Sequence, residues 1–238
     1  MPPKSQLWLL ATLVVAGIVS AFSGRIDPYF LDVTMGVGIA ITLAASLNLI
    51  NGFTGQFSLG HAGFMAVGAY SSAVITTNFG PKLLPLVGGQ VWILFPVALV
   101  IGGLLAALAG LAVGAPSLRL KGDYLAIVTL GFGEIIKVIF QNVDAVGGAR
   151  GLVGVPNYTN LFWTFGVAAV TVYVVWGLLN STYGRGFLAE ADDEVAAEAM
   201  GLNPTRYKIT AVVVGSFFAG VAGGLYAHLK GYLNPGGF

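Results

Sequence analysis

The sequence TYGRGFLAEADDEVAAEAMGLNPTRYK, residues Thr182–Lys208, is the one long polar interruption in a strongly apolar chain. Apolar runs long enough to cross a membrane flank it on both sides. Two interpretations fit this arrangement: a solvated connector between two membrane helices, or a docking element through which an outside partner moves those helices. Its charged residues are Arg185, Glu190, Asp192, Asp193, Glu194, Glu198, Arg206 and Lys208.

The composition of the whole chain indicates a membrane protein. Of its 238 residues, 56% are hydrophobic and 9% are charged, whereas about 25% of the residues of an average soluble domain are charged. Such a chain cannot cover a water-facing surface, so the sequence predicts a polytopic membrane protein. No basic stretch with interleaved aromatic residues indicates nucleic-acid binding.

Cysteine and histidine usage excludes several kinds of site. The chain has no cysteine, which rules out disulfides, thiolate metal ligands and a cysteine nucleophile. Its two histidines, His61 and His228, lie far apart in the sequence. We therefore predict no metal site.

The apolar runs predict an all-α transmembrane bundle of about seven spans, forming one membrane domain over residues 1–238. A spanning helix needs about 20 mostly apolar residues, and backbone in hydrocarbon must satisfy its own hydrogen bonds, which favours helices. The predicted spans are Leu7–Phe22, Tyr29–Ile50, Phe57–Thr77, Val91–Gly114, Tyr124–Val143, Leu161–Asn180 and Ile209–Leu229.

Glycine is abundant inside these runs, with 35 residues in the chain. Small residues spaced four apart let membrane helices approach closely, as in Gly110-x-x-x-Gly114 and Gly220-x-x-x-Gly224. We expect most of these glycines to serve helix packing.

Basic residues near the span ends predict the orientation in the cell (inner) membrane, with a cytoplasmic N-terminus. The first run is either a retained span or a cleaved signal peptide. If 181–208 is cytoplasmic, the basic residues inside are Lys4, Arg119, Lys121, Arg185, Arg206 and Lys208. Those outside are Arg25, Lys82, Arg150 and Lys230.

The stretch NGFTGQFSLGHAGFM, residues 51–65, is uncharged but polar and glycine-rich. Transporters use broken helices near the midplane to meet their substrate, which makes Gln56, Ser58 and His61 candidates for the translocation pathway. The alternative is a short turn in which Ser58 caps the following helix. The residues alone leave both interpretations open.

Glu134 lies near the middle of the fifth run, and Lys137 follows three residues later. Residues at this spacing share a helix face, so we predict an intrahelical ion pair that faces the interior of the bundle. Charges inside a membrane are functional candidates by default. A structural or gating role is favoured over direct contact with substrate.

The segment Val146–Pro156 has four glycines and a proline, which predicts a turn-rich loop on the outer side. Within the polar interruption, Leu188, Ala191, Val195 and Ala199 recur at helical spacing. We therefore predict one amphipathic helix over 187–200, with Gly201 as its C-cap and a break at Asn203-Pro204. Its acidic character favours a protein partner over anionic lipid.

Four stretches together resemble the permease subunits of branched-chain amino-acid ABC importers, specifically the M-type member of the pair. They are similar in amino-acid sequence and occur in the same order as in the family, and they cover most of the chain. The stretches are GFTGQFSLGHAGFMAVGAYSSA (52–73), LRLKGDYLAIVTLGFGEIIKVIF (118–140), GGARGLVGVP (147–156) and the region 184–235.

The resemblance implies that 184–204 is a cytoplasmic coupling segment received by an ATP-binding subunit. The residues it places at this contact are Glu194, Glu198, Gly201 and Arg206. It also implies that Gln56–His61 and the Glu134 span lie near the translocation path. The implied partners are a second permease subunit, two ATP-binding subunits, an extracytoplasmic solute-binding protein and membrane lipid.

No cofactor is expected on this chain, because ATP is used by the partner ATPase subunits. The absence of a GxxxxGK[ST] phosphate loop agrees with this. Two features depart from the family pattern. Glu190-Ala191 replaces an aliphatic residue and an arginine, which would alter docking of the partner. The chain also stops at Phe238, where the family continues, so we expect a C-terminally incomplete permease.

The function predicted from the sequence is therefore transport and not catalysis. The alternative is a secondary transporter in which Glu134 and His61 relay protons or ions, and Lys137 beside Glu134 argues against it. No paired aspartates, HExxH motif or serine–histidine arrangement supports an enzyme. Leucine-type amino acids, other amino acids, urea and short amides all stay open as substrates.

Overall fold

A computed structural model describes residues 3–21, 27–85, 88–117 and 123–238. The helices are α1 (Pro3–Ala21), α2 (Pro28–Asn51), α3 (His61–Val74), α4 (Gly80–Leu83), α5 (Val91–Ser117), α6 (Asp123–Asn142), α7 (Leu161–Leu179), α8 (Thr182–Asp192), α9 (Glu194–Ala199) and α10 (Pro204–Lys230). The shorter elements are the π-helical turn η2 (Ile75–Phe79), the 3-10 turns η4 (Asp144–Val146), η5 (Gly148–Arg150) and η6 (Pro235–Gly237), and the strands β1 (Leu152–Val153) and β2 (Tyr232–Leu233).

The all-α architecture is confirmed, but the number of spans differs from the prediction. Among the described residues, five helices are long and apolar enough to cross a membrane: α2, α5, α6, α7 and α10. In α1, the described part includes the shorter apolar segment Ala11–Ser20. The seven predicted spans are therefore not confirmed.

The third predicted span also begins later than expected. The α3 helix starts at His61, and Phe57–Gly60 is irregular. Two glycines account for this. Gly55 has a left-handed φ of +63°, a conformation that glycine adopts at little cost. A Cβ on Gly60 would collide with the carbonyl oxygen of Thr129.

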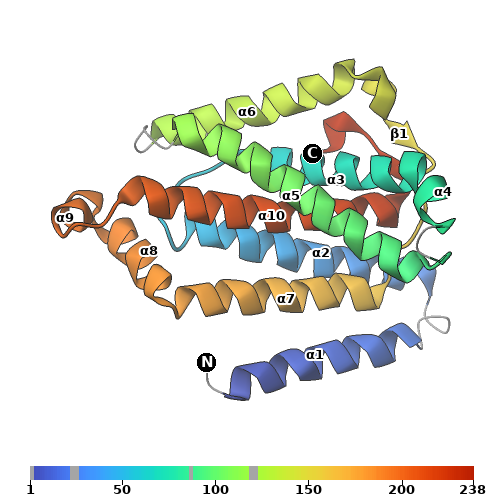
Figure 1. Ribbon diagram of the computed structural model, residues 1–238, viewed down its shortest axis with the longest axis horizontal. Coiled ribbons are helices and arrows are strands. Elements are labelled where there is room, and N and C mark those ends of the chain that lie inside the picture. The colour runs from blue at the N-terminus through green and yellow to red at the C-terminus, as the bar shows by residue number, and fades with distance from the viewer. Residues whose placement is uncertain (1–2, 22–26, 86–87, 118–122) are drawn as a thin grey trace.

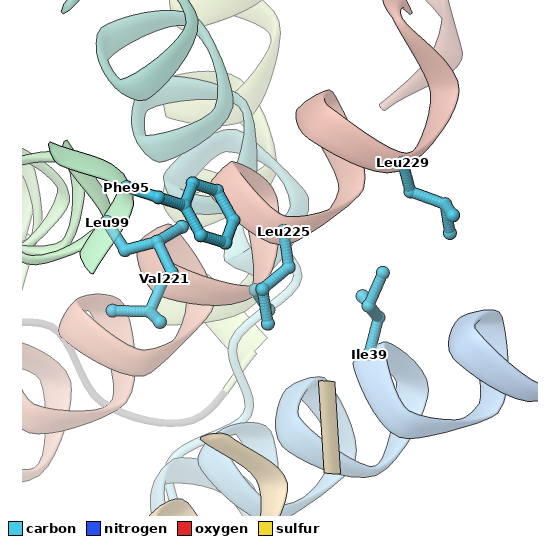
Figure 2. Close-up of a cluster of buried hydrophobic side chains, with 7 residues drawn as sticks. Ile39, Phe95, Leu99, Val221, Leu225 and Leu229 are labelled. Atoms are coloured by element: carbon cyan, nitrogen blue, oxygen red, sulfur yellow. The ribbon is translucent and has the colours of Figure 1, made fainter. Parts of the chain in front are cut away.

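Helix α10 is the centre of the bundle and packs against α2, α3 and α5. Figure 2 shows side chains from three of these helices meeting in one apolar cluster. Burial of such side chains stabilises the arrangement in water by roughly 1.5–3 kcal/mol each; in lipid, close packing takes over this role. The cluster contains Ile39, Phe95, Leu99, Val221, Ala222, Leu225 and Leu229.

Glycines let α10 approach its neighbours, as the sequence predicts. A Cβ on Gly68 of α3 would overlap the backbone of Gly220 in α10. A Cβ on Gly224 would meet the side chains of Leu99 and Ser72. Without side chains in the way, the two backbones come into direct contact, which maximises dispersion between helices in an apolar solvent.

The bundle has two different ends (Figure 1). Helices α8 and α9 project from one end, where the N-terminus of α1 also lies, and α4 and β1 lie at the opposite end. Arg185 and Arg206 are therefore at the α8–α9 end, and Lys82 and Arg150 are at the other. The two pairs lie at opposite ends, and which end is cytoplasmic stays a prediction. Three residues of that prediction, Arg25, Arg119 and Lys121, lie outside the described residues.

The predicted turn-rich loop at the α4 end is confirmed, with one addition. Gly147, Gly148, Gly151 and Gly154 all have positive φ. The addition is an antiparallel pairing of β1 with β2, in which Leu152 faces Leu233. This short pairing connects the loop to the chain that follows α10.

Candidate functional site

The polar segment folds as two helices, so the predicted single helix over 187–200 is wrong. Asp193 separates α8 from α9 in an extended conformation, and its carboxylate accepts hydrogen bonds from the backbone N–H groups of Val195 and Ala196. A side-chain cap of this kind satisfies backbone donors at a helix start. The apolar periodicity continues across Asp193 and conceals this break.

The end of the segment follows the prediction more closely. Met200 ends α9, and Gly201 follows with a left-handed φ of +85°. The Gly201 N–H donates to the carbonyl of Glu198, as at many helix C-termini. Asn203 then caps α10 by accepting from the Arg206 N–H, with Pro204 as the first helical residue. The break at Asn203-Pro204 is confirmed.

A buried ion-pair cluster fixes this segment to α10. The Lys208 Nζ lies 2.9 Å from a carboxylate oxygen of Glu194 and 3.4 Å from one of Glu190. The Glu190 side chain is 2% exposed. Burial raises the pKa of Glu190 to about 7, with Glu194 adding to the rise and Lys208 opposing it. One lysine of α10 therefore holds both α8 and α9.

This cluster corrects the expectation for the Glu190-Ala191 departure. The sequence suggested that Glu190-Ala191 would alter docking of the partner. Glu190 instead points inward to Lys208, so its charge is compensated within the chain. The predicted contact residue Glu194 is also engaged by Lys208, whereas Glu198, Gly201 and Arg206 are exposed.

The outer surface of α8 and α9 carries an exposed apolar stripe beside exposed charged residues. The stripe that gave the helical periodicity is exposed along its length: Leu188, Ala191, Val195 and Ala199. Val195 is 68% exposed and Met200 is 83% exposed. Exposed apolar patches of this kind mark interaction sites more often than isolated surface residues do.

The irregular segment after α2 contacts the projecting helices. We call residues 52–60 the α2–α3 loop. A Cβ on Gly55 would lie 3.3 Å from the Cα of Ala191 in α8, so the two backbones touch. At the base of the loop, the Asn51 side chain accepts a hydrogen bond from the Ser58 N–H. Gly60 precedes α3 without a side-chain cap, so the alternative of Ser58 as N-cap is wrong.

Gln56, Ser58 and His61 are buried together in this region. Gln56 donates through Nε2 to the hydroxyl of Thr54, and its Oε1 has no partner among the described residues. The hydroxyl of Ser46 lies 2.9 Å from His61 Nε2. Gln56 and Ser58 border a cavity of about 10 Å³, the size of a single water site. Their role in a pathway stays a prediction.

The α2–α3 loop is joined to α6 at its other end. The Leu59 N–H donates to the Thr129 hydroxyl at 3.0 Å. From Thr129 onward, one face of α6 packs on α3: a Cβ on Gly63 would lie 3.1 Å from the Cα of Gly133, and Phe140 stacks on Tyr70 with ring centroids 4.2 Å apart.

Glu134 and Lys137 form the predicted intrahelical ion pair, with 3.1 Å between Nζ and Oε2. The prediction that they face the interior of the bundle is wrong for the described residues. Glu134 is 61% exposed and Lys137 is 34% exposed. Both border a groove of about 110 Å³ between α3 and α6. Because Lys137 compensates Glu134, the pair lacks the isolated acid that a proton relay needs.

Three contributors to the site escaped the sequence interpretation: Lys208, Ala191 and Thr129. Lys208 stands at the start of an apolar run, where a basic residue is expected at the membrane surface. Ala191 acts through a backbone contact with Gly55, and Thr129 acts through its hydroxyl group. No sequence pattern predicts contacts of this kind. Of these, Lys208 carried a signal, because a charge inside a helix that otherwise reads as a span needs a partner.

Residues 29–236 match the family model described as branched-chain amino acid transport system, permease component. The chain belongs to this permease family. It is 34% identical to the high-affinity branched-chain amino acid transport system permease protein LivM of Salmonella typhimurium and 33% identical to LivM of Escherichia coli. In both cases the match covers 99% of this chain and 60% of the relative. The chain therefore spans about 60% of the length of these curated relatives.

Family members carry names for other substrates as well. A protein of Haloferax volcanii named as a putative glucose ABC transporter permease is 31% identical over 84% of this chain and 62% of its own length. No solved structure matches this permease-family chain. Among the described residues, no group of three or more histidine, aspartate or glutamate side chains could hold a metal ion.

Proposed function

We propose that the chain is a membrane permease subunit of an ATP-driven importer for branched-chain or related amino acids. Family membership and the printed names of the LivM relatives support this. The observation that carries the proposal is the projecting α8–α9 pair, which is apolar outside and fixed inside to the helix at the centre of the bundle.

In this proposal, α8 and α9 dock on an ATP-binding subunit, and the N-terminus lies on the same cytoplasmic side. The exposed stripe with Val195 and Met200 enters a cleft of the ATPase. Glu198, Gly201 and Arg206 lie at the edge of this contact. ATP is bound and hydrolysed by the partner, and this chain holds no cofactor.

Two routes would carry movement from the docking helices into the membrane. Lys208 transmits it directly to α10, because both carboxylates of the cluster come from α8 and α9. The contact of Ala191 with Gly55 transmits it to the α2–α3 loop, which is hydrogen-bonded to α6 through Leu59 and Thr129. The second route ends at the helix that carries Glu134 and Lys137.

A second permease subunit is proposed to cover α6. Only 17% of its apolar window is buried among the described residues. Its exposed apolar side chains are Tyr124, Ile127, Leu130, Ile135, Val138 and Ile139. A partner at this face would enclose the groove between α3 and α6, with an extracytoplasmic solute-binding protein delivering solute at the α4 end.

The test is co-purification of the full-length protein with an ATPase subunit. Met200→Asp places a charge on the docking surface and is expected to reduce ATPase association and solute-stimulated ATP hydrolysis at unchanged membrane levels. Val153→Asp is the matched control, because Val153 is also exposed but lies at the opposite end. Equal ATPase association of both variants with the wild type would overturn the proposed role of α8 and α9.

A further inference from the structure

The groove between α3 and α6 combines a pair of opposite charges with an apolar wall. Its charged wall is formed by Glu134 and Lys137 of α6. Its apolar lining includes Leu59, Ala62, Leu130 and Phe140. Gly63 and Gly133 bring the two helices close behind it.

The charges are placed where lipid alone would not tolerate them. Glu134 and Lys137 lie in the middle of a helix that is long and apolar enough to span the membrane. Ionised groups at such a depth face protein, water or a ligand, because contact with hydrocarbon is costly. Their partial exposure in the groove therefore calls for a polar occupant.

Charge balance selects the kind of occupant. The pair is neutral as a whole, so a ligand with one charge would leave one wall group unmatched. A zwitterion is also neutral, so it brings an opposite charge to each member of the existing Glu134–Lys137 pair without adding net charge to the groove.

We propose that this groove is a binding subsite for the charged end of a zwitterionic amino acid. Glu134 accepts hydrogen bonds from the α-ammonium group, and Lys137 donates to the α-carboxylate. The apolar side chain of the amino acid lies against Ala62, Leu130 and Phe140. This inference rests on the proposed function and assigns residues to the recognition of its substrate.

The size of the groove agrees with a small solute. Its volume of about 110 Å³ is comparable with the cavity of about 150 Å³ that holds a benzene ring in an engineered protein. Leu59, at one end of the groove, is the residue bonded to Thr129. A shift of the α2–α3 loop would therefore change the shape of the subsite.

The test uses protection of a cysteine in this naturally cysteine-free chain. Ala62→Cys lies exposed in the groove, and Val153→Cys is an exposed control outside it. The full-length protein is labelled in membranes with a small aqueous thiol reagent. The added ligands are leucine, isocaproate, which lacks the amino group, and isoamylamine, which lacks the carboxylate. We expect leucine to slow labelling at position 62. Each analogue should protect at least about tenfold more weakly, because it lacks one charged group, and the loss of a single charge-assisted hydrogen bond is enough to lower the affinity by that factor.

Two matched variants then separate the roles of the charges. Glu134→Gln leaves Lys137 as the charged partner. In this variant we expect isocaproate to protect position 62 better than it does in the wild type, and leucine to protect it less. Lys137→Met leaves Glu134 and is expected to shift protection from leucine toward isoamylamine. The double variant should lose protection by all three compounds while the protein stays in the membrane.

Failure of this subsite is distinguishable from failure of the proposed function. If position 62 is not labelled, or if leucine does not protect it, the subsite is overturned even where the ATPase still co-purifies. Protection that is unchanged in the double variant overturns it as well. Loss of ATPase association alone would count against the importer and leave the labelling result to decide on the groove.

Discussion

Two sites on this chain pair a lysine with glutamate, and they differ in sequence separation and in their surroundings. Lys208 lies with Glu190 and Glu194 in a buried cluster, where the Glu190 side chain is 2% exposed. Lys137 pairs with Glu134, which is 61% exposed, at the edge of a groove. The first holds three helices in place, and the second presents its charges to whatever enters the groove. Burial, and not the pairing itself, separates a structural ion pair from an accessible one.

The largest effect is expected from Lys208→Met. This change removes the Lys208 cation from the buried carboxylate of Glu190 and from Glu194, and breaking a buried ion pair from one side typically costs about 3–5 kcal/mol. We expect a marked loss of folded protein, measured by thermal unfolding and size-exclusion chromatography in detergent. The double variant Lys208→Met with Glu190→Gln should recover much of the loss. Equal instability of the single and double variants would show that Lys208 matters for packing and not for charge.

The second-largest effect is a pH dependence of the stability of the folded protein, caused by the raised pKa of Glu190. Its pKa is raised from 4.5 to about 7 in the folded protein, so the folded state binds more protons than the unfolded state between these values. The contribution of Glu190 to stability is therefore fully present below pH 4.5 and is lost as the pH rises through about 7.

The measurement compares wild type and Glu190→Gln between about pH 4 and 8. The free energy of unfolding of wild type relative to the variant should fall with rising pH, by about 1–3 kcal/mol in total. Asp192→Asn on the same helix is the control, because Asp192 is exposed. A difference that does not change with pH would contradict the assignment.

The smallest effect on stability is expected from Glu134→Gln. Ion pairs exposed to water contribute about 0–1 kcal/mol. Both charges border the groove, so with water in the groove the amount of folded protein should stay near the wild-type level. This small effect contrasts with the buried Lys208 cluster, where removing one partner lowers the free energy of unfolding several times more. A loss as large as that of Lys208→Met would mean that the Glu134–Lys137 pair is shielded from water in the folded protein.

The sequence predicted the helical class, the order of the apolar runs and the pairing of Glu134 with Lys137, because periodicity and spacing are local signals. It did not predict that Glu190 is buried. Its partner Lys208 lies beyond two helix ends, and the turn at Asp193 decides which way α8 faces. The exposed position of Glu134 also depends on how α6 packs on α3, which no local pattern contains.

The α2–α3 loop illustrates the same limit. Its glycines and polar residues predicted a broken helix or a turn, and the structure has an irregular segment before His61. Its contacts with Ala191 and Thr129 join parts of the chain that are far apart in sequence. Backbone contacts of this kind leave no trace in composition or periodicity.

The pairing of β1 with β2 has a consequence for the order of assembly during synthesis. Residues 152–153 leave the ribosome long before their partners at 232–233, and Tyr232 also donates a hydrogen bond to the carbonyl of Arg150. The loop between α6 and α7 must therefore wait, with its edge unpaired, until α10 has entered the membrane. Closure of this loop therefore follows insertion of the central helix, and the β1–β2 end of the bundle stays open until residues 232–233 have emerged.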